Sequence, residues 1–358
     1  MLFNESMKTR VLIAMSGGID SSVAAYLLRK EGYDVTGITM EFPGAANKPS
    51  RSGLTPAGDA AGICGFLGMP HQIINLSREI EDLVIKKFAT EYSIGRTPNP
   101  CVDCNRFLKF GVLLERALSL GFDFFATGHY AQTERTGSRY LLAKPRDRNK
   151  DQTYFLYRIP GDKLNSILFP LARLTKEEVR EIARREKLPI AERPESQDLC
   201  FLQQDEFRAF ILQRISGVKT GPIVDLDGNI LGQHKGIIHY TVGQRGGLGV
   251  PHKHPLYVLS IDAFLNTIIV GEKKDLRAAG LMAGDLNNLA GTWPSTAHAK
   301  TRYRQSEFPC RVFPEGDKLR IVFDEDHEAV TPGQSVVLYD GDIVLGGGTI
   351  EKALNVHR

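Results

Sequence analysis

The sequence predicts an α/β protein that begins with a doubly wound parallel sheet and ends in a small β-barrel. Three observations carry this prediction. Apolar runs alternate with segments of helical period up to about Tyr130, the composition becomes glycine-rich after about residue 205, and short apolar strands separated by turns follow from about Leu286. We therefore expect an α/β domain over 1–205, a small central domain over 206–285 and a barrel domain over 286–358.

The first region shows the strand–helix rhythm. Its apolar runs predict strands at 11–15, 34–40, 71–75 and 122–127. Its helical periods predict helices at 23–30, 59–67, 80–92 and 107–120. A segment rich in Gly, Pro, Ser and Asn, 43–56, is expected to be a mobile loop. This rhythm is typical of parallel sheets, because each crossover between parallel strands needs a long connection, usually a helix.

The region after about residue 205 differs in composition and in its predicted elements. Residues 221–249 are rich in glycine and include a strand-like piece at 236–242. Predicted strands at 319–323, 335–338 and 342–345 alternate with turns, which favours a small barrel or sandwich.

Composition limits the class of protein. The chain has 358 residues, 42% hydrophobic and 24% charged, which is typical of a globular protein with two or three domains. No apolar run approaches the roughly 20 residues of a membrane span, and the N-terminus lacks the apolar stretch of a signal peptide. We therefore expect a cytoplasmic protein with no membrane partner. Because the net charge is only +3, a nucleic-acid site must come from local clusters.

The most informative segment joins the first strand to the first helix. The run SGGIDSS, 16–22, follows an apolar strand directly. Backbone N–H groups converge at such a turn, the helix N-terminus adds partial positive charge, and two glycines allow close approach, so the turn suits phosphate oxygens. No lysine-bearing Walker pattern occurs in the chain. An ordinary turn with Asp20 as a helix cap is the alternative.

This segment resembles the PP-loop of the ATP pyrophosphatase superfamily, whose members split ATP between the α and β phosphates to adenylate a substrate oxygen. The resemblance implies a HUP-like fold, ATP as cosubstrate, and Mg²⁺ held with the help of Asp20. The positions that it assigns to ATP are Ala14, Met15, Ser16, Gly17, Gly18, Ile19, Asp20, Ser21, Met40 and Gly128. Three of these lie at or just past predicted strand ends, where a parallel sheet forms one pocket: Ser16, Met40 and Gly128.

Cysteine supplies the second pattern. Cys101 and Cys104 lie between two predicted helices, where Pro98 and Pro100 are expected to block helix formation and to stiffen a loop. Half of a zinc site is the alternative, although no second Cys-x-x-Cys occurs. A third thiol, Cys200, lies far along the chain. The two remaining thiols are expected to be small buried side chains: Cys64 and Cys310.

Longer segments around these cysteines are similar to one family, the tRNA-specific 2-thiouridylases. GRTPNPCVDCNRFLKF at 95–110 resembles the catalytic-cysteine motif of the family, and ESQDLCF at 195–201 resembles its second-cysteine motif. Further segments match in order: ATGHYA at 126–131, KDQTYFL at 150–156, HYTVGQRGGLGV at 239–250, KTRYRQ at 300–305 and FDEDHEAVTPGQS at 323–335. The resemblance spans essentially the whole chain. It implies synthesis of 2-thiouridine at the wobble uridine, position 34, of tRNAs for Lys, Glu and Gln.

The resemblance also implies how sulfur is delivered. A uracil C2 carbonyl has no leaving group, and adenylating its oxygen creates one. By the family pattern, Cys200 carries a persulfide, and Cys104 is the nucleophile that then forms a disulfide with it. This requires their Cα atoms to come within about 7 Å. A sulfur donor such as a cysteine desulfurase or a sulfur-relay protein is implied as a partner, and the target base is expected near Asn99, Pro100 and Cys101.

One position departs from the commoner family pattern, because many members carry Asp where this chain has Cys101. An acidic group is thereby missing or replaced by a thiolate. The substitution also opens a second route, in which Cys101, Cys104 and Cys200 hold three irons of a [4Fe–4S] cluster and the fourth iron binds sulfide.

Local basic clusters carry the case for tRNA. The segments 144–150 and 300–304 combine Lys and Arg, the second with an aromatic residue, and suit phosphate contact and base stacking. A solvated surface is the alternative for each. The resemblance makes the β-rich region a tRNA platform and assigns tRNA contacts to His129, Lys150, Asp151, Gln152, Tyr303, Arg304 and Gln334.

Two other functions stay open from the residues alone. A PP-loop ligase that adenylates a small metabolite would not need Cys104 and Cys200. A non-catalytic protein that binds tRNA or senses redox state would not consume ATP.

Overall fold

The computed structural model describes residues 8–42, 55–192, 207–215, 217–328 and 330–355. The chain forms two compact units: Met1–Glu81 with Asp103–Gln204, and Asp82–Val102 with Asp205–Arg358. Most of the predicted loop 43–56, the thiol Cys200 and the expected boundary at 205 lie outside the described residues. The division into three domains stays a prediction.

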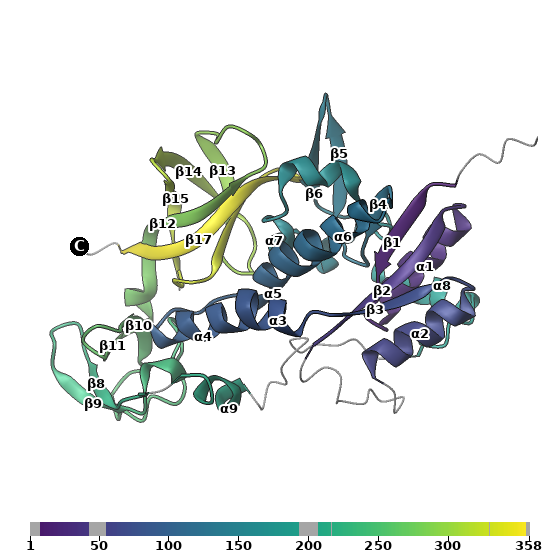
Figure 1. Ribbon diagram of the computed structural model, residues 1–358. Helices are drawn as coiled ribbons and strands as arrows, with labels where there is room; N and C mark the ends of the chain where they lie inside the picture. Colours follow the sequence, from purple (N-terminus) through teal and green to yellow (C-terminus); the bar gives the residue numbers. More distant parts are fainter. Residues whose placement is uncertain (1–7, 43–54, 193–206, 216, 329, 356–358) are drawn as a thin grey trace, which may run out of the picture. The chain divides into compact units, whose positions relative to one another are not determined.

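A five-stranded parallel sheet forms the centre of the first unit, in the order β3-β2-β1-β4-β7. Figure 1 labels its strands β1 to β4. Its strands are β1 (Arg10–Ala14), β2 (Asp34–Glu41), β3 (His71–Asn75), β4 (Phe124–Ala126) and β7 (Ile167–Leu168). The chain runs outward from β1 to β3 and then returns to place β4 on the other side of β1. Open sheets bind ligands beyond the carboxyl ends of the strands at such a reversal. The predicted fold class is confirmed.

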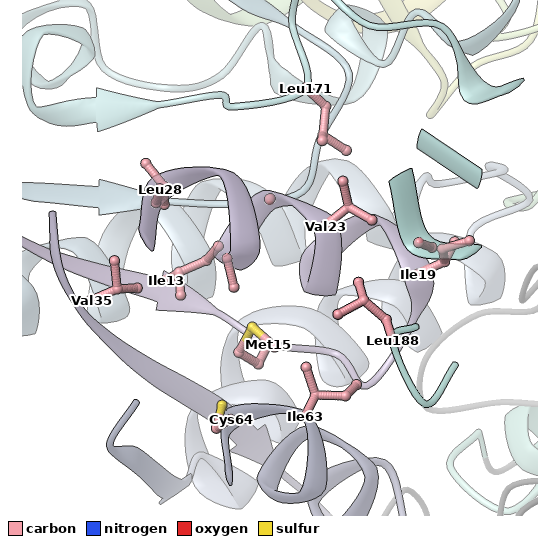
Figure 2. Close-up of a cluster of buried hydrophobic side chains, with 14 of the residues drawn as sticks. Ile13, Met15, Ile19, Val23, Leu28, Val35, Ile63, Cys64, Leu171 and Leu188 are labelled. Carbon is pink, nitrogen blue, oxygen red and sulfur yellow. The ribbon is translucent and has the colours of Figure 1, made fainter. Parts of the chain in front are cut away.

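Helices cover both faces of this sheet. On one face α1 (Ile19–Lys30), α2 (Pro56–Phe66) and α8 (Lys176–Arg185) share a buried cluster with β1. Figure 2 shows Ile13 and Met15 of this cluster beside Val23 of α1 and Ile63 of α2. On the other face Phe110 packs edge-to-face against Phe125 of β4, with ring centroids 6.0 Å apart.

Two cysteines are buried in hydrophobic cores, one in each unit. Cys64, labelled in Figure 2, is fully buried against β2, and burial raises the pKa of its thiol to about 11. Cys310 is buried in the second unit, where burial raises the pKa of its thiol to about 12. Both are protonated at neutral pH, which confirms the expectation that they are packing residues.

Two long helices connect the units along the chain. The first runs without a break from 77 to 93, as α3 (Ser77–Ile80), the π-helical segment η1 (Glu81–Ile85) and α4 (Lys86–Ser93). The second runs from 100 to 119, as α5 (Pro100–Asp103), the π-helical segment η2 (Cys104–Leu113) and α6 (Leu114–Ser119). The other elements of the first unit are β5 (Gln132–Thr136), β6 (Arg139–Ala143), η3 (Arg148–Lys150), α7 (Thr153–Leu156) and η4 (Gly161–Ser166).

The second helix corrects the prediction that Cys101 and Cys104 lie in a stiff loop. The helix begins at Pro100, seven residues before the predicted start at 107, so both cysteines are helical. Proline suits the first helical position, because its N–H would have no partner there. Asn99 completes the start, since its side-chain Oδ1 accepts a hydrogen bond from the Cys101 N–H at 3.2 Å.

A four-stranded sheet in the second unit has the order β10-β11-β8-β9. Its strands are β8 (Gly221–Val224), β9 (Ile230–His234), β10 (Tyr257–Asp262) and β11 (Thr267–Gly271), and α9 (Phe207–Leu212) and η7 (Lys273–Leu276) flank it in sequence. Phe88 and Tyr92 of α4 are buried in its core. The predicted strand at 236–242 is wrong: Gly236 has a φ of +125° and starts the 3₁₀ helix η6 (Ile237–His239), whose isoleucines are buried in that core.

Six antiparallel strands close into a barrel, as predicted, because β12 pairs with both β15 and β17. They are β12 (Arg277–Asn288), β13 (Thr296–Lys300), β14 (Phe308–Glu315), β15 (Lys318–Glu328), β16 (Ser335–Asp340) and β17 (Ile343–Asn355). The strands run longer than the apolar runs that predicted them, because pairing partners set where a strand ends. Within the described residues, no helix has the length and apolar character of a membrane span.

Candidate functional site

The turn at 16–22, which the sequence predicts to suit phosphate oxygens, joins β1 to the first turn of α1. We call it the phosphate-type loop. Hydrogen bonds among its own groups hold its shape. Gly17 has a φ of +74°, and a Cβ there would come within 2.9 Å of the Pro56 carbonyl oxygen, so the position requires glycine. The Ser21 hydroxyl accepts the Ser16 N–H at 3.3 Å and donates to the Gly18 carbonyl at 3.1 Å. The Ser22 hydroxyl donates to the same carbonyl at 2.7 Å. These bonds fix a tight turn at the N-terminus of α1.

Neighbouring strands bring other predicted nucleotide residues to the same edge of the sheet. The Met15 N–H donates to the Ile38 carbonyl of β2 at 2.8 Å, two residues before Met40. Gly128 follows β4, and a Cβ at this glycine would lie 2.7 Å from the Ser21 nitrogen. The backbone at Gly128 therefore packs directly on the first turn of α1, and only glycine permits that approach.

Asp20 does not cap α1. The N-cap residue is Gly18, and no side-chain cap is formed there among the described residues. Instead, the Asp20 Oδ1 accepts hydrogen bonds from the Lys176 ammonium at 2.6 Å and from the Tyr130 hydroxyl at 2.9 Å. The Lys176 side chain is only 6% exposed. Lysine is almost never buried without a charged partner, so the contact with Asp20 explains how the Lys176 ammonium is accommodated beside the phosphate-type loop.

The start of α8 places Lys176. Thr175 and Glu178 form a capping box, in which each side chain accepts the other residue's backbone N–H. The Lys176 N–H donates to the Asp147 carboxylate at 2.9 Å. Sequence reasoning missed Lys176. One signal was available, because a lysine in the first turn of a helix opposes the helix dipole, and such broken local rules concentrate at functional sites.

Cys104 lies in the same unit as the loop, at the start of η2, and is 9% exposed. The next residue, Asn105, is buried, and its side-chain amide donates to the Phe155 carbonyl at 3.1 Å. Its side-chain oxygen has no hydrogen-bond partner among the described residues. A buried acceptor of this kind is costly unless a donor from a ligand or another segment reaches it.

Comparison with known proteins identifies the family. Family models match three consecutive parts of the chain: a tRNA methyl transferase HUP domain at 9–204, a tRNA methyl transferase PRC-barrel domain at 208–272, and an aminomethyltransferase beta-barrel domain at 279–350. The tRNA-specific 2-thiouridylase MnmA 1 of Syntrophus aciditrophicus is 54% identical over 98% of this chain and 94% of the relative. The chain belongs to the tRNA-specific 2-thiouridylase family.

Two further members of the family support this. MnmA 1 of Caldanaerobacter subterraneus is 46% identical over 97% of this chain and 99% of its own length. MnmA of Acetivibrio thermocellus is 44% identical over 96% of this chain and 99% of its own length.

In the first unit, two of the residues assigned to tRNA hold the protein's own backbone. Asp151 is buried, and its Oδ1 accepts hydrogen bonds from the Thr153 N–H at 2.9 Å and hydroxyl at 2.7 Å. The Gln152 Oε1 accepts the Tyr130 N–H at 2.8 Å. Lys150 ends the short helix η3 just before them. Asp151 thus holds the start of α7, and Gln152 holds the backbone of Tyr130, whose hydroxyl donates to Asp20.

In the second unit, the residues assigned to tRNA differ in exposure. Arg304 is exposed and Tyr303 is half-buried, with the Lys300 ammonium 5.8 Å from the Tyr303 ring centroid. The Gln334 side-chain amide donates to the Thr97 carbonyl at 2.7 Å. Gln334 therefore has an intramolecular role, beside whatever it does with a ligand.

His129 is held in one neutral tautomer. Its Nε2 lies 3.4 Å from the Lys109 ammonium, which can only donate, so Nε2 is the acceptor and Nδ1 carries the proton. The Nδ1–H then donates to the Thr127 hydroxyl at 2.8 Å. Loss of solvent, and then the charge of Lys109, lower the pKa of His129 well below its usual value.

This lowered pKa predicts a pH-dependent stability. Below the unfolded pKa of about 6.5, unfolded His129 takes up a proton that the folded protein refuses, so the free energy of unfolding falls as the pH falls. His129→Gln is expected to remove up to about 1.4 kcal/mol of this loss per pH unit below 6.5. Urea unfolding of both proteins between pH 7.5 and pH 5 measures it. Parallel pH profiles would contradict the assignment.

Proposed function

We propose that this chain is an ATP-dependent tRNA sulfurtransferase that converts uridine 34 into 2-thiouridine. Membership of the family supports the reaction and the tRNA substrate. The observation that carries the chemistry is the ion pair between buried Lys176 and partly exposed Asp20 beside the phosphate-type loop, in the unit that also contains Cys104. The names of the family models refer to methyl transfer, but a loop shaped for phosphate oxygens serves adenylation, which thiolation needs.

The first step is adenylation of the base. The O2 oxygen of uridine attacks the α-phosphorus of ATP, the bond to the bridging oxygen of the β-phosphate breaks, and pyrophosphate leaves. N–H groups at the start of α1 stabilise the phosphate oxygens, and the Lys176 ammonium neutralises charge that develops on the departing pyrophosphate.

Asp20 and the nucleotide phosphates would hold Mg²⁺, which supplies further charge neutralisation when bound. The donor set fits this ion, because Mg²⁺ is usually held by one or two carboxylates together with substrate phosphates. In the described part of the chain, no group of three or more His, Cys, Asp or Glu side chains could hold a metal without such help.

The second step is sulfur transfer. The terminal sulfur of a persulfide on Cys200 attacks C2, and AMP leaves with the electron pair of the C2–O bond. The Cys104 thiolate then attacks the Cys200 sulfur, so the S–S bond of the persulfide breaks, a Cys104–Cys200 disulfide forms and 2-thiouridine is released. A dithiol reductant must restore the two thiols, and a sulfur donor such as a cysteine desulfurase or a relay protein must reload Cys200.

Cys101 favours a second version of the sulfur step. It lies three residues before Cys104 on the same continuous helix and would give, with Cys200, three thiolates for a [4Fe–4S] cluster. The cluster would supply an iron site for sulfide. Anaerobic purification and reconstitution followed by iron analysis separates the versions, because absence of iron eliminates the cluster.

The test of the function is reconstitution. The protein, ATP, Mg²⁺, cysteine, a cysteine desulfurase, a dithiol reductant and unmodified tRNA for Lys, Glu or Gln are expected to yield 2-thiouridine at position 34, measured by mass spectrometry of nucleosides. A tRNA with cytidine at position 34 is the control. Formation of AMP from ATP without tRNA, and no thiolated nucleoside with it, would favour a ligase for a small metabolite. We place this reaction in the cytoplasm, with the central and barrel domains as the tRNA platform.

A further inference from the structure

We propose that the barrel turn Thr331–Gln334, supported by Arg302, positions the segment that presents the target base. In this view Gln334 acts through Thr97 and so fixes Asn99, Pro100 and Cys101. The meaning of that segment rests on the proposed function. We call the contacts between the turn Thr331–Gln334 and Thr97 the clamp. These contacts all lie within the second unit.

The turn satisfies both backbone polar groups of Thr97. The Thr97 N–H donates to the Pro332 carbonyl at 2.9 Å, and the Thr97 carbonyl accepts the Gln334 side-chain amide at 2.7 Å. The Thr97 hydroxyl donates to the Thr241 hydroxyl at 3.3 Å. Both backbone polar groups of Thr97 are therefore hydrogen-bonded, as they would be in a strand within a sheet, although the segment between the two helices is irregular.

Gly333 makes the close approach possible. It has a φ of +92°, and a Cβ there would lie 2.8 Å from the Thr97 nitrogen, 2.9 Å from its carbonyl carbon and 3.0 Å from its oxygen. These are backbone atoms and cannot swing aside. The backbone of the turn therefore lies directly against the backbone of Thr97, which only glycine allows.

Ile350 of β17 ties the residue before Thr97 to the same turn. Its carbonyl accepts the Arg96 guanidinium at 3.0 Å and the Gly333 N–H at 2.8 Å, and its N–H donates to the Gln334 carbonyl at 2.8 Å. Arg96 also pairs with Glu91 of α4 at 3.0 Å. Two consecutive residues of the segment are anchored on the closed barrel.

Arg302 connects this turn to the residues assigned to tRNA. Its guanidinium donates to the Thr331 hydroxyl at 2.8 Å and to the Val242 carbonyl at 3.4 Å. Tyr303 and Arg304 follow it directly. The Arg302 side chain thus stabilises the clamp. Arg302 itself directly precedes the two residues that are expected to contact tRNA.

The path from the clamp to the target-base segment is short and stiff. Pro98 has a fixed φ, and Asn99 caps the helix through the Cys101 N–H at 3.2 Å. The Asn99 carbonyl also accepts the Val102 N–H at 3.2 Å. A shift at Thr97 is therefore expected to move the first turn of α5, since only Pro98 and Asn99 lie between.

Two variants of the full-length protein test the proposal. Gln334→Met keeps the length of the side chain and removes the donor, and Gly333→Ala pushes a Cβ into Thr97. Gly316→Ala is the matched control, because Gly316 is also in the barrel with a φ of +63° but has open space around its Cβ position. Hydrogen exchange of the Thr97, Cys101 and Val102 amides is measured without tRNA, alongside tRNA affinity and the thiolation rate.

Both variants are expected to exchange these amides about tenfold faster than wild type and to lower kcat about 10- to 100-fold, because a small misplacement of reacting groups is costly. The tRNA Kd is expected to stay within about threefold, and Gly316→Ala is expected to match wild type. Unchanged exchange in Gln334→Met overturns the proposal. So does a tRNA Kd weakened more than about tenfold with kcat retained, which would make Gln334 a direct tRNA contact. If wild type thiolates no tRNA, the function fails, while the exchange data still decide on the clamp.

Discussion

Replacing Lys176 with methionine is expected to lower the rate of tRNA adenylation by about two to three orders of magnitude, the usual effect of losing one preorganised charge at a developing anion. Methionine keeps most of the length of the side chain and removes the ammonium that lies 2.6 Å from Asp20. Because the Lys176 side chain is only 6% exposed, solvent has little access to the position of the ammonium. Release of pyrophosphate from ATP in the presence of unmodified tRNA measures the effect.

A matched lysine controls for the loss of charge and of an ion pair. Lys86 also lies 2.6 Å from an aspartate, Asp82, but on the exposed surface of α4, with 64% of its side chain accessible. Lys86→Met is expected to keep wild-type adenylation, because exposed ion pairs of this kind contribute little. Equal activity of the two methionine variants would remove Lys176 from the chemistry. Thermal melts of both variants separate loss of chemistry from loss of folding.

Replacing Cys104 with serine is expected to abolish thiolation, by about four orders of magnitude or more, and to leave adenylation of tRNA intact. A serine hydroxyl is not ionised at neutral pH and cannot break a persulfide bond, whereas the phosphate-type loop and Lys176 are unchanged. Nucleoside mass spectrometry measures thiolation, and release of AMP and pyrophosphate measures adenylation. Loss of both activities would show that Cys104 supports the fold or the nucleotide and is not a nucleophile.

Two other cysteines make the result specific. Cys310→Ala removes a thiol that burial keeps protonated in the barrel, and it is expected to retain thiolation. Cys101→Ser distinguishes the two routes for sulfur. The persulfide route predicts retained thiolation, whereas the cluster route predicts loss of both iron and activity.

Local sequence is sufficient to predict an element where short-range residue patterns set the backbone conformation directly. Two glycines after an apolar strand, followed by a helix, define the turn at 16–22, and strand–helix alternation defines the parallel sheet. Local sequence is misleading at 100–104, because Pro100 predicts an interruption of helix there, although proline is favourable at the first helical position. It is also misleading at 236–242, where two adjacent isoleucines fill a core from a 3₁₀ turn.

The sequence alone predicts a parallel sheet followed by a barrel, the phosphate-type loop and the resemblance to the family. Each of these predictions uses short segments whose residues are neighbours in the chain. Only the tertiary structure paired Asp20 with Lys176, 156 residues later, and placed Gln334 on Thr97, 237 residues earlier. Local periodicity cannot identify Lys176 or Gln334 as a partner. Their contacts form only when α8 packs beside α1 on the sheet and when the barrel closes. The charge beside the phosphate-type loop and the contacts that hold the segment before Cys101 are therefore properties of the tertiary structure.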